Sequence, residues 1–572
     1  MKCAWALGLL LFYIKVPVKD AEDSESTAKA FIGQLRSAAM NVIRNPLAFD
    51  NLKHYAALND TYDEENILSR TLRLTQSISV TADPMFLRAR DARLVAVHDS
   101  AIADYVESYL TKERAHVVLV IPAKGAEQAL PSSPSDQQLG SMGTQRLRGP
   151  KIDLAVAAEW AHTAAPSRLV RRTLPNGLEV WVWPQPQSPF HTALLGFHGG
   201  RELGEKAGVA TAVLWARQYR TSPASSSGLL SQFKIASEHT QISIRGIGPN
   251  LQGSLEKLRG GIDFSVYWPP QQFTNQLELF EREEEQPAVR LRNARLDAIF
   301  GSHVYGRHAS LAQMRDVSAN DIYWWSEQVR RPENGVLIFV GDTNPEELFR
   351  LAEAQFGDFG SEKTSNAPAV KPPSPPELRM HSRPEVLFRN QPDVTQAFAV
   401  FSCSLPQVDA NSYAAARLFE QLVEAQLRSS LRERTQVSYS VTPNLTVYRG
   451  GMAVLSISAD IDYDRLEPAM ASFRKVATID APSLVDADRL GVAKVGLVSQ
   501  SDWWNSSTPE IAQQLLLAWN LGWPVDSVLS TASRGLGVSA GTIASLEKAC
   551  RQSVVITFRG DEPRLRAAWG TP

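Results

Sequence analysis

The sequence predicts an α+β fold built from repeated domains, each with a largely antiparallel sheet packed against helices. Two observations support this prediction. The first is a local pattern that occurs three times, at residues 97–122, 317–341 and 538–560: a helix start, a helix, a polar break and a β-rich run. The second is the order of elements between connectors, where β-rich runs come early, helices follow, and a β-rich run comes near the end.

The three repeats begin alike and end alike. Each starts with a Ser or Asp that suits a helix N-cap, and Ser318 in VSANDI occupies the same place as Ser539 in VSAGTI. Each ends in a run of β-branched and other apolar residues, which predicts a strand. The three predicted strands are Val117–Ile121, Val336–Val340 and Val554–Phe558.

A longer repeat links the start of the chain to its last third. Residues 8–20 resemble residues 451–463, where apolar and polar residues alternate as in a half-buried strand. Residues 1–123 are therefore expected to be a partial domain whose N-terminal part is missing. The apolar run after Met1 is too short to span a membrane and lacks the small-residue cleavage site of a signal peptide, so we interpret it as a strand.

Two polar stretches divide the chain. Residues 124–166 are rich in Ser, Gly, Gln and Pro, and residues 361–385 are rich in Pro, which is typical of linkers. Besides the partial domain, this division predicts a complete domain at 167–360 and a complete C-terminal domain at 386–572.

Composition argues against several classes of partner and site. The 572 residues carry 59 basic and 61 acidic side chains without a basic block, so a nucleic-acid partner is not expected. The three cysteines, Cys3, Cys403 and Cys550, form no C-x-x-C pair. They indicate neither a disulfide framework nor a thiolate metal site.

Residues 537–541, GVSAG, match the G-x-S-x-G pattern of hydrolase nucleophiles. A nucleophile elbow requires a strand that runs into the serine, whereas the preceding ASRGLG is loop-like. We therefore interpret Ser539 as a helix cap and keep a serine hydrolase as a further hypothesis.

Three other groups have both a functional and a structural interpretation. His303 and His308 are five residues apart without a carboxylate between them, which favours a loop before a helix over a metal site. The acidic run Glu281–Glu285 is expected to be a solvated helix face. Trp503 and Trp504 could line a peptide cleft, but packing is the commoner role.

Three stretches resemble parts of the insulinase/pitrilysin-like zinc metallopeptidases, the inverzincins. Residues 174–208, which contain GFHGGRELGEKAG, resemble the opening of a domain in that family, and residues 303–359 resemble its end. Residues 418–441 resemble the middle of the family's substrate-binding domain. The resemblance covers nearly all of the chain and implies repeated insulinase-type domains.

The family binds zinc through H-x-x-E-H on a helix, where two His are ligands and the Glu activates water. Here the motif would follow EKAG, and the sequence reads VATAVLWARQYR. Thr211 and Trp215 stand at the His positions and Leu214 at the Glu position. No H-x-x-E-H occurs elsewhere in the chain, so we expect no zinc or other cofactor in it.

The non-catalytic half of long family members keeps an Arg and a Tyr near the substrate. The segment LRERTQVSYSV places them at Arg432 and Tyr439. A guanidinium can hold a peptide carbonyl, and a phenol can donate to an oxyanion forming at zinc. The alternative is that Arg432 is a solvated helix residue and Tyr439 an aromatic on a strand face.

The resemblance implies the non-catalytic portion of a metallopeptidase that works inside a closed chamber. This chain would supply chamber walls and bind a peptide or unfolded polypeptide, and a zinc-bearing half would complete the enzyme. The alternative is a stand-alone binding subunit that pairs with a separate zinc-bearing chain. A chain that starts at Met1 would be cytoplasmic, whereas a longer parent protein would allow export.

Overall fold

The computed structural model describes residues 2–6, 9–13, 24–109, 111 and 168–570, apart from gaps at 64, 84, 87–89, 205, 219–228, 249, 263–269, 361–369, 372, 435–439 and 479–484. The chain divides into two compact units. Unit 1 comprises residues 1–144 and 222–229, and unit 2 comprises residues 145–221 and 230–572. No described helix is long and apolar enough to cross a membrane.

Unit 1 contains a β-hairpin and a group of helices. Strand β1 (Lys2–Ala6) pairs antiparallel with β2 (Leu9–Tyr13), so part of the predicted N-terminal strand is present and has a partner that the sequence did not reveal. The helices are α1 (Ser24–Ile43), α2 (Pro46–Asp63), α3 (Ile67–Thr81), α4 (Arg90–Val95) and α5 (Asp99–Tyr109). The predicted strand Val117–Ile121 lies outside the described residues.

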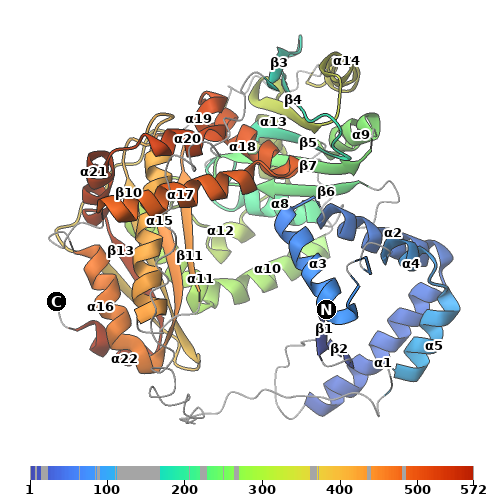
Figure 1. Ribbon diagram of the computed structural model, residues 1–572, viewed down its shortest axis with the longest axis horizontal. Coiled ribbons are helices and arrows are strands. Elements are labelled where there is room, and N and C mark those ends of the chain that lie inside the picture. The colour runs from blue at the N-terminus through green and yellow to red at the C-terminus, as the bar shows by residue number, and fades with distance from the viewer. Residues whose placement is uncertain are drawn as a thin grey trace. The chain divides into compact units, whose positions relative to one another are not determined.

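Unit 2 has two lobes, each built on one sheet (Figure 1). The N-terminal lobe has a six-stranded sheet in the order β3-β4-β8-β5-β7-β6. Its strands are β3 (Val170–Thr173), β4 (Glu179–Pro184), β5 (Phe190–His198), β6 (Leu230–Ile235), β7 (His239–Ile247) and β8 (Gly335–Gly341). Its helices are α8 (Val209–Gln218), α9 (Leu251–Gly261), α10 (Pro270–Glu285), α11 (Pro287–Phe300), α12 (Leu311–Arg315), α13 (Ala319–Val329) and α14 (Pro345–Phe356).

The C-terminal lobe repeats this topology in the order β9-β13-β10-β12-β11. Its strands are β9 (Glu385–Asn390), β10 (Gln396–Leu405), β11 (Val441–Val447), β12 (Ala453–Asp462) and β13 (Val555–Gly560). Its helices are α15 (Tyr413–Arg428), α16 (Leu466–Ala477), α17 (Ala487–Trp504), α18 (Thr508–Leu521), α19 (Val525–Leu529), α20 (Thr531–Leu536), α21 (Ala540–Arg551) and α22 (Glu562–Trp569).

The match between the two sheets confirms the α+β prediction. In each lobe an early strand pairs in parallel with the last strand, β4 with β8 and β9 with β13, while the other neighbours are antiparallel. The closing strands lie where the repeated ending placed them. The helix before each is capped as predicted, because Ser318 and Ser539 accept the backbone N–H groups of Asp321 and Thr542.

Helix α18 joins the lobes, because it belongs to the second half of the chain and packs on β5 and β8 of the first sheet. Its buried residues Leu515 and Leu516 share one hydrophobic core with Leu194 and Ile338 of that sheet. The hydroxyls of Thr508 and Thr192 lie 2.9 Å apart across the same contact. Helices α9 and α14 also contact strands of this sheet.

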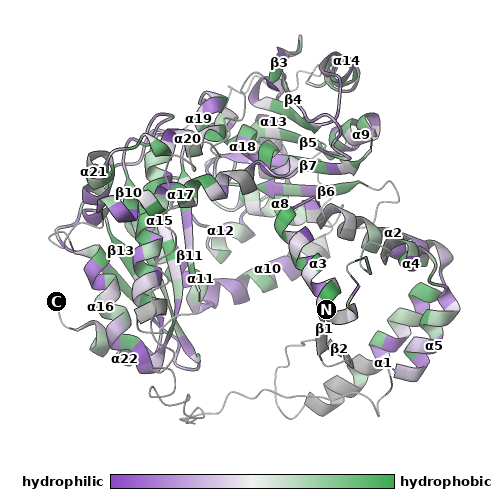
Figure 2. Cartoon of the chain, in the orientation of Figure 1, coloured by the Kyte–Doolittle hydropathy of each residue, from purple (hydrophilic) through white to green (hydrophobic). Residues whose placement is uncertain are grey.

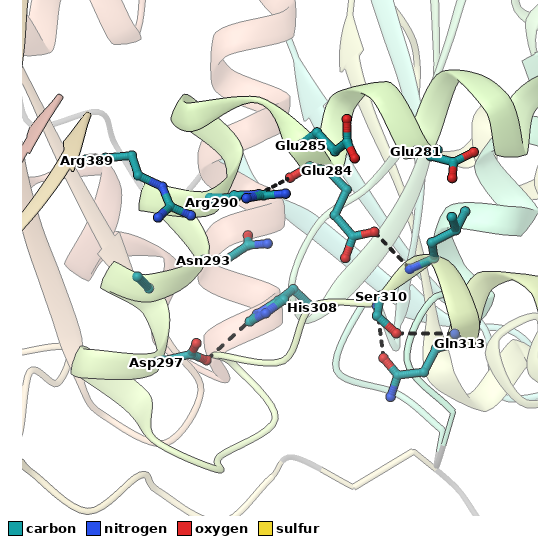
Figure 3. A pocket seen from close by; sticks show the side chains of 12 residues that line it. Glu281, Glu284, Glu285, Arg290, Asn293, Asp297, His308, Ser310, Gln313 and Arg389 are labelled. Atoms are coloured by element: carbon teal, nitrogen blue, oxygen red, sulfur yellow. Dashed lines mark hydrogen bonds and ion pairs between the residues drawn. The ribbon is translucent and has the colours of Figure 1, made fainter. Parts of the chain in front are cut away.

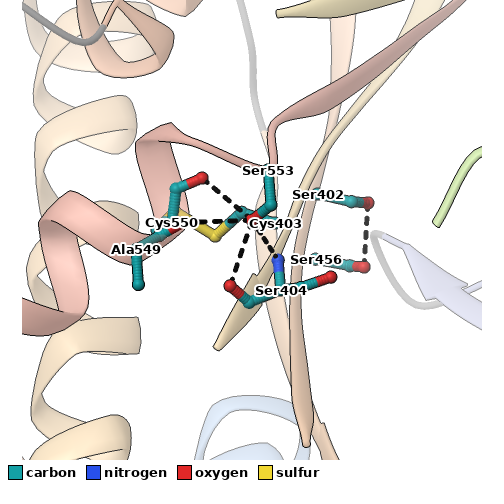
Figure 4. Close-up of a disulfide and its surroundings, with 7 residues drawn as sticks. All are labelled: Ser402, Cys403, Ser404, Ser456, Ala549, Cys550 and Ser553. Atoms are coloured by element: carbon teal, nitrogen blue, oxygen red, sulfur yellow. Dashed lines mark hydrogen bonds between the residues drawn. A yellow bond between two sulfur atoms is a disulfide. The ribbon is translucent and has the colours of Figure 1, made fainter. Parts of the chain in front are cut away.

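A disulfide links Cys403 on β10 to Cys550 on α21 (Figure 4). The sequence indicated no disulfide framework, and for this pair that interpretation was wrong. The two cysteines are 147 residues apart, and only the packing of α21 on β10 brings their Cα atoms to 5.0 Å. Hydrogen bonds also link the end of α21 to β10. The Ser553 hydroxyl donates to the Ser404 carbonyl and accepts the Ser404 N–H.

Gly196 allows α18 to lie close to the first sheet, and this contact can be tested. A Cβ atom at residue 196 would lie 2.5 Å from Leu516 Cδ1. We expect Gly196→Ala to lower the free energy of unfolding by about 1–3 kcal/mol through overpacking. Chemical denaturation should show that Leu516→Ala lowers the free energy of unfolding less in the Gly196→Ala protein than in the native protein. Gly260→Ala, with no atom near its new Cβ, is the control.

The disulfide is expected to stabilise the C-terminal lobe. We expect the Cys403→Ala/Cys550→Ala variant to lose about 2–4 kcal/mol of unfolding free energy, because the bond closes a long loop in the unfolded chain. Denaturant titration measures the loss, and mass spectrometry of non-reduced peptides should find the linked pair. Cys3→Ser is the matched control. Equal stability of the native protein with and without reductant would contradict the prediction.

Candidate functional site

Helix α8 carries the three positions that the predicted resemblance aligns with a zinc motif. Thr211, Leu214 and Trp215 are all partly buried, and the ring of Trp215 packs against Phe273 and Phe280 of α10 at centroid distances of 6.1 and 5.8 Å. An indole and an isobutyl group offer a metal no lone pair. These positions therefore do not fit zinc, and packing takes the place of ligands.

The two predicted substrate-binding residues are only partly placed. Arg432 lies in the π-helical segment Ser429–Arg434 that follows α15, where its side chain is not described. Tyr439 lies outside the described residues, shortly before β11. The role of both residues stays a prediction.

One face of the C-terminal sheet is polar and faces away from the helical core. Along β12 the residues Ala453, Leu455 and Ile457 enter that core, while Ser456 and Ser458 point to the opposite face. The register continues this face across the sheet, because Ser458 pairs with Thr442 on β11 and with Val400 on β10. We call this surface the open sheet face.

Helix α11 crosses the open sheet face and encloses a cavity of about 380 Å³, which we call the sheet-face cavity. The helix contributes residues spaced as one helical face: Ala288, Leu291, Arg292 and Arg295. The sheet contributes Phe398, Val400, Thr442, Asn444, Ser456, Ser458, Thr557 and Arg559. The walls therefore combine three guanidinium groups, hydroxyls and a small apolar patch.

A second pocket, of about 560 Å³, lies between α10, α11 and the segment before α12 (Figure 3). Its acidic side chains come mainly from Glu281–Glu285 on α10, a hydrophilic helix in Figure 2. The predicted solvated face is confirmed at Glu281, Glu283 and Glu285, which are exposed, whereas Glu284 is half-buried. Glu284 accepts the N–H of Leu311 at the start of α12. This one carboxylate thus satisfies an N–H group at the start of α12.

The two predicted histidine candidates lie apart from any metal-binding arrangement. His308 Nδ1 is 3.8 Å from a carboxylate oxygen of Asp297. His303 Nε2 is 2.7 Å from the Ser374 carbonyl oxygen. Within the part of the chain that the structure describes, no group of three or more His, Cys, Asp or Glu side chains could hold a metal ion.

The remaining sequence candidates lie in helices. Ser539 is the N-cap of α21, and no strand leads into it because α20 precedes it. This position confirms the capping interpretation. Trp503 and Trp504 are the last residues of α17, and their side chains are not described.

The lobes meet at a buried polar group that we call the interlobe cluster: His198, Glu202, Glu238 and Arg449. Both carboxylate oxygens of Glu238 accept the backbone N–H of Arg449, each at 3.0 Å, and Tyr305 donates its hydroxyl to the same carboxylate. Glu238 lies in the β6–β7 turn and Arg449 in the β11–β12 turn, so this carboxylate ties one lobe to the other.

Burial shifts the titration of this cluster. It raises the pKa of Glu202 to about 8, and the nearby Glu238 carboxylate adds to the rise. Only one Glu202 oxygen has a hydrogen-bond partner, the N–H of Gly200, and Oε2 has none among the described residues. His198 stacks on Trp519 at 3.9 Å, and burial followed by the charge of Arg449 lowers its pKa to about 3.

Sequence reasoning missed both the arginines of the sheet-face cavity and the interlobe cluster. Arg292, Arg295 and Arg559 come from segments more than 260 residues apart, and no motif joins them. The one available signal was the period of α11, where residues 288, 291, 292 and 295 share a face. The alternation along β12 predicted a polar face but not the helix that covers it.

Glu202 makes the stability of unit 2 depend on pH. Its pKa of about 8 in the folded protein exceeds the ordinary value of 4.5, so the folded form binds the extra proton between these values. Below about pH 6.5 the lowered pKa of His198 adds an opposing rise in stability. Stability should therefore fall between about pH 6.5 and 8, by at most about 1.4 kcal/mol per pH unit, and level off above it.

Thermal unfolding between about pH 6.5 and 9 measures this slope. Glu202→Gln cannot titrate and is expected to flatten the profile, whereas Glu353→Gln, which replaces an exposed carboxylate on α14, should leave it unchanged. An unchanged slope in Glu202→Gln would assign the pH dependence to another group.

Comparison with known proteins agrees with this architecture. Residues 316–477 match the family described as the peptidase M16 inactive domain. No curated protein sequence matches the chain.

Three solved structures share the fold. A peptidase M16 inactive domain from Pseudomonas fluorescens is 15% identical, with a TM-score of 0.55, and the alignment covers 68% of this chain and 97% of that one. A protease from Helicobacter pylori is 13% identical, with a TM-score of 0.56 and coverage of 68% and 99%. The periplasmic protease PqqL from Escherichia coli is 12% identical, with a TM-score of 0.53 and coverage of 92% and 62%.

At these identities the structural likeness establishes the fold, and the family match applies to residues 316–477. The predicted resemblance to insulinase/pitrilysin-like peptidases is confirmed: residues 316–477 match the inactive domain of peptidase M16, and the chain shares its fold with M16-type structures.

Proposed function

We propose that this chain binds peptide substrate and forms chamber walls for M16-type proteolysis, while a zinc-bearing H-x-x-E-H half supplies the metal and the attacking water. The observation that carries the proposal is helix α8. It occupies the family's zinc-helix position in the sequence but presents Thr211, Leu214 and Trp215, and the indole packs against α10.

The open sheet face supports a binding role. A polar sheet surface with exposed residues such as Thr442 and Asn444 offers hydrogen bonds to an extended peptide without a catalytic group. Arg432 and Tyr439 would add contacts to the substrate from the same lobe. The substrate would be a peptide or an unfolded polypeptide.

The second candidate function is a stand-alone binding subunit that pairs with a separate zinc-bearing chain. The same observation supports it, because either arrangement needs the metal from elsewhere. Affinity purification from source cells separates the two: a distinct co-purified H-x-x-E-H chain favours the subunit, and a single longer polypeptide favours the first proposal.

The disulfide bears on where such a protein would work. Disulfides persist in oxidising compartments and are rare in reducing ones. We therefore propose an exported location, and the structurally similar PqqL is a periplasmic protease.

The purified chain tests the proposal directly. We expect no hydrolysis of unstructured peptides and less than one zinc per ten chains after loading and desalting, because α8 provides no ligand. Metal analysis and chromatography of the peptides provide the measurements. Zinc-dependent cleavage by the pure chain would overturn the proposal.

Binding is the second part of this test. A labelled unstructured peptide should bind the chain in fluorescence anisotropy, and Arg432→Ala should weaken binding by roughly tenfold, the scale of a charged hydrogen bond. Arg350→Ala, on the exposed side of α14, is the control for a change in net charge.

A further inference from the structure

The sheet-face cavity exists because the two ends of α11 meet the sheet differently. At the C-terminal end of the helix, Ile299 and Phe300 are buried against Val454 and Val555 of the sheet. Towards the N-terminal end the sheet offers short polar side chains and the helix offers Ala288 and two arginines, so about 380 Å³ remain open. Cavities of this size are typical of small-ligand sites.

The charge of the cavity has one sign. Arg292, Arg295 and Arg559 line it, and none of its described lining residues is an Asp or a Glu. Burial lowers the pKa of Arg295, and the positive charge of Arg292 lowers it further. Burial and the charge of Arg201 likewise lower the pKa of Arg292, with Glu283 as a partial offset. An anion between these groups would relieve their repulsion.

The arginines are presented from both walls. Arg559 is held in place, because it donates to the Gln391 side chain at 3.0 Å and lies over the ring of Phe398. Arg295 approaches from the opposite wall on α11 and is half-buried, whereas Arg292 is exposed at the mouth. Phe398, Val400 and Leu291 supply an apolar patch beside the guanidinium groups.

Acidic groups near the cavity offset this charge only in part, through Glu283 beside Arg292. Asp460 and Arg559 flank Phe398 in one row of the sheet, so two strand spacings of about 4.8 Å separate their backbones. Asp460 is not part of the lining and accepts the Ser440 hydroxyl at 3.3 Å.

We propose that the sheet-face cavity binds a carboxylate group of a peptide, held between Arg295 and Arg559. The planar guanidinium fork matches the two oxygens of a carboxylate, and the apolar patch suits the short aliphatic stem that carries it. A net charge of -2 for the chain gives no field for a polyanion such as nucleic acid. The inference rests on the proposed peptide-binding function.

The test compares acidic and neutral peptides on the full chain. Fluorescence anisotropy would use an unstructured labelled peptide with one Glu, its Glu→Gln counterpart, and both with a free or an amidated C-terminus. We expect the native protein to bind carboxylate-bearing peptides about tenfold to a hundredfold more tightly than the neutral peptide. The arm with the larger effect identifies the carboxylate as side-chain or C-terminal.

Variants locate the effect in the cavity. Arg295→Gln should abolish the preference, and Arg292→Gln, at an exposed position that folding tolerates, should reduce it. Arg350→Gln should retain it. Equal affinity for acidic and neutral peptides, or a preference that survives Arg295→Gln and Arg292→Gln, would overturn the inference and leave peptide binding intact.

A small dicarboxylate separates the inference from the function on which it rests. If no peptide binds, the proposed function fails. Calorimetry with glutarate then tests whether the sheet-face cavity binds a carboxylate. Glutarate binding to the native chain but not to Arg295→Gln supports the carboxylate site. Absence of glutarate binding to the native chain would then overturn it.

Discussion

The packing of α18 across the first sheet is the constraint on which the rest of unit 2 depends. This helix belongs to the second half of the chain, yet Leu516 lies against Gly196 and Trp519 stacks on His198 of the N-terminal lobe. One hydrophobic core therefore runs through both lobes. Helix α11 makes a second contact between the lobes, because it belongs to the first half of the chain and packs on β9 and β13 of the second sheet.

The packing of the two lobes against each other also explains the shifted pKa values at their junction. Two turns from different lobes enclose Glu238, whose carboxylate accepts the N–H of Arg449. The same enclosure removes water from Glu202 and His198 and favours their neutral forms. The polar groups at the junction are thus a consequence of docking, and they make the junction sensitive to pH.

The fold separates scaffold from chemistry. Helix α8 packs Trp215 against α10 and carries neither His nor Glu at positions 211, 214 and 215. The open sheet face and the sheet-face cavity do not depend on that helix for their side chains. Because function resides in sites rather than in the fold, a binding site on the second sheet does not require a metal on α8.

The sequence by itself determined the local elements and the resemblance to M16-type peptidases. The capped helices at Ser318 and Ser539, the strands that follow them and the polar alternation along β12 are short-range patterns, which periodicity and capping chemistry reveal. Only the tertiary structure decided that Cys403 meets Cys550 and that Arg295 meets Arg559 across a cavity. These pairs are far apart in the chain, and their meeting depends on how α21 and α11 pack on the sheet, which no local pattern records.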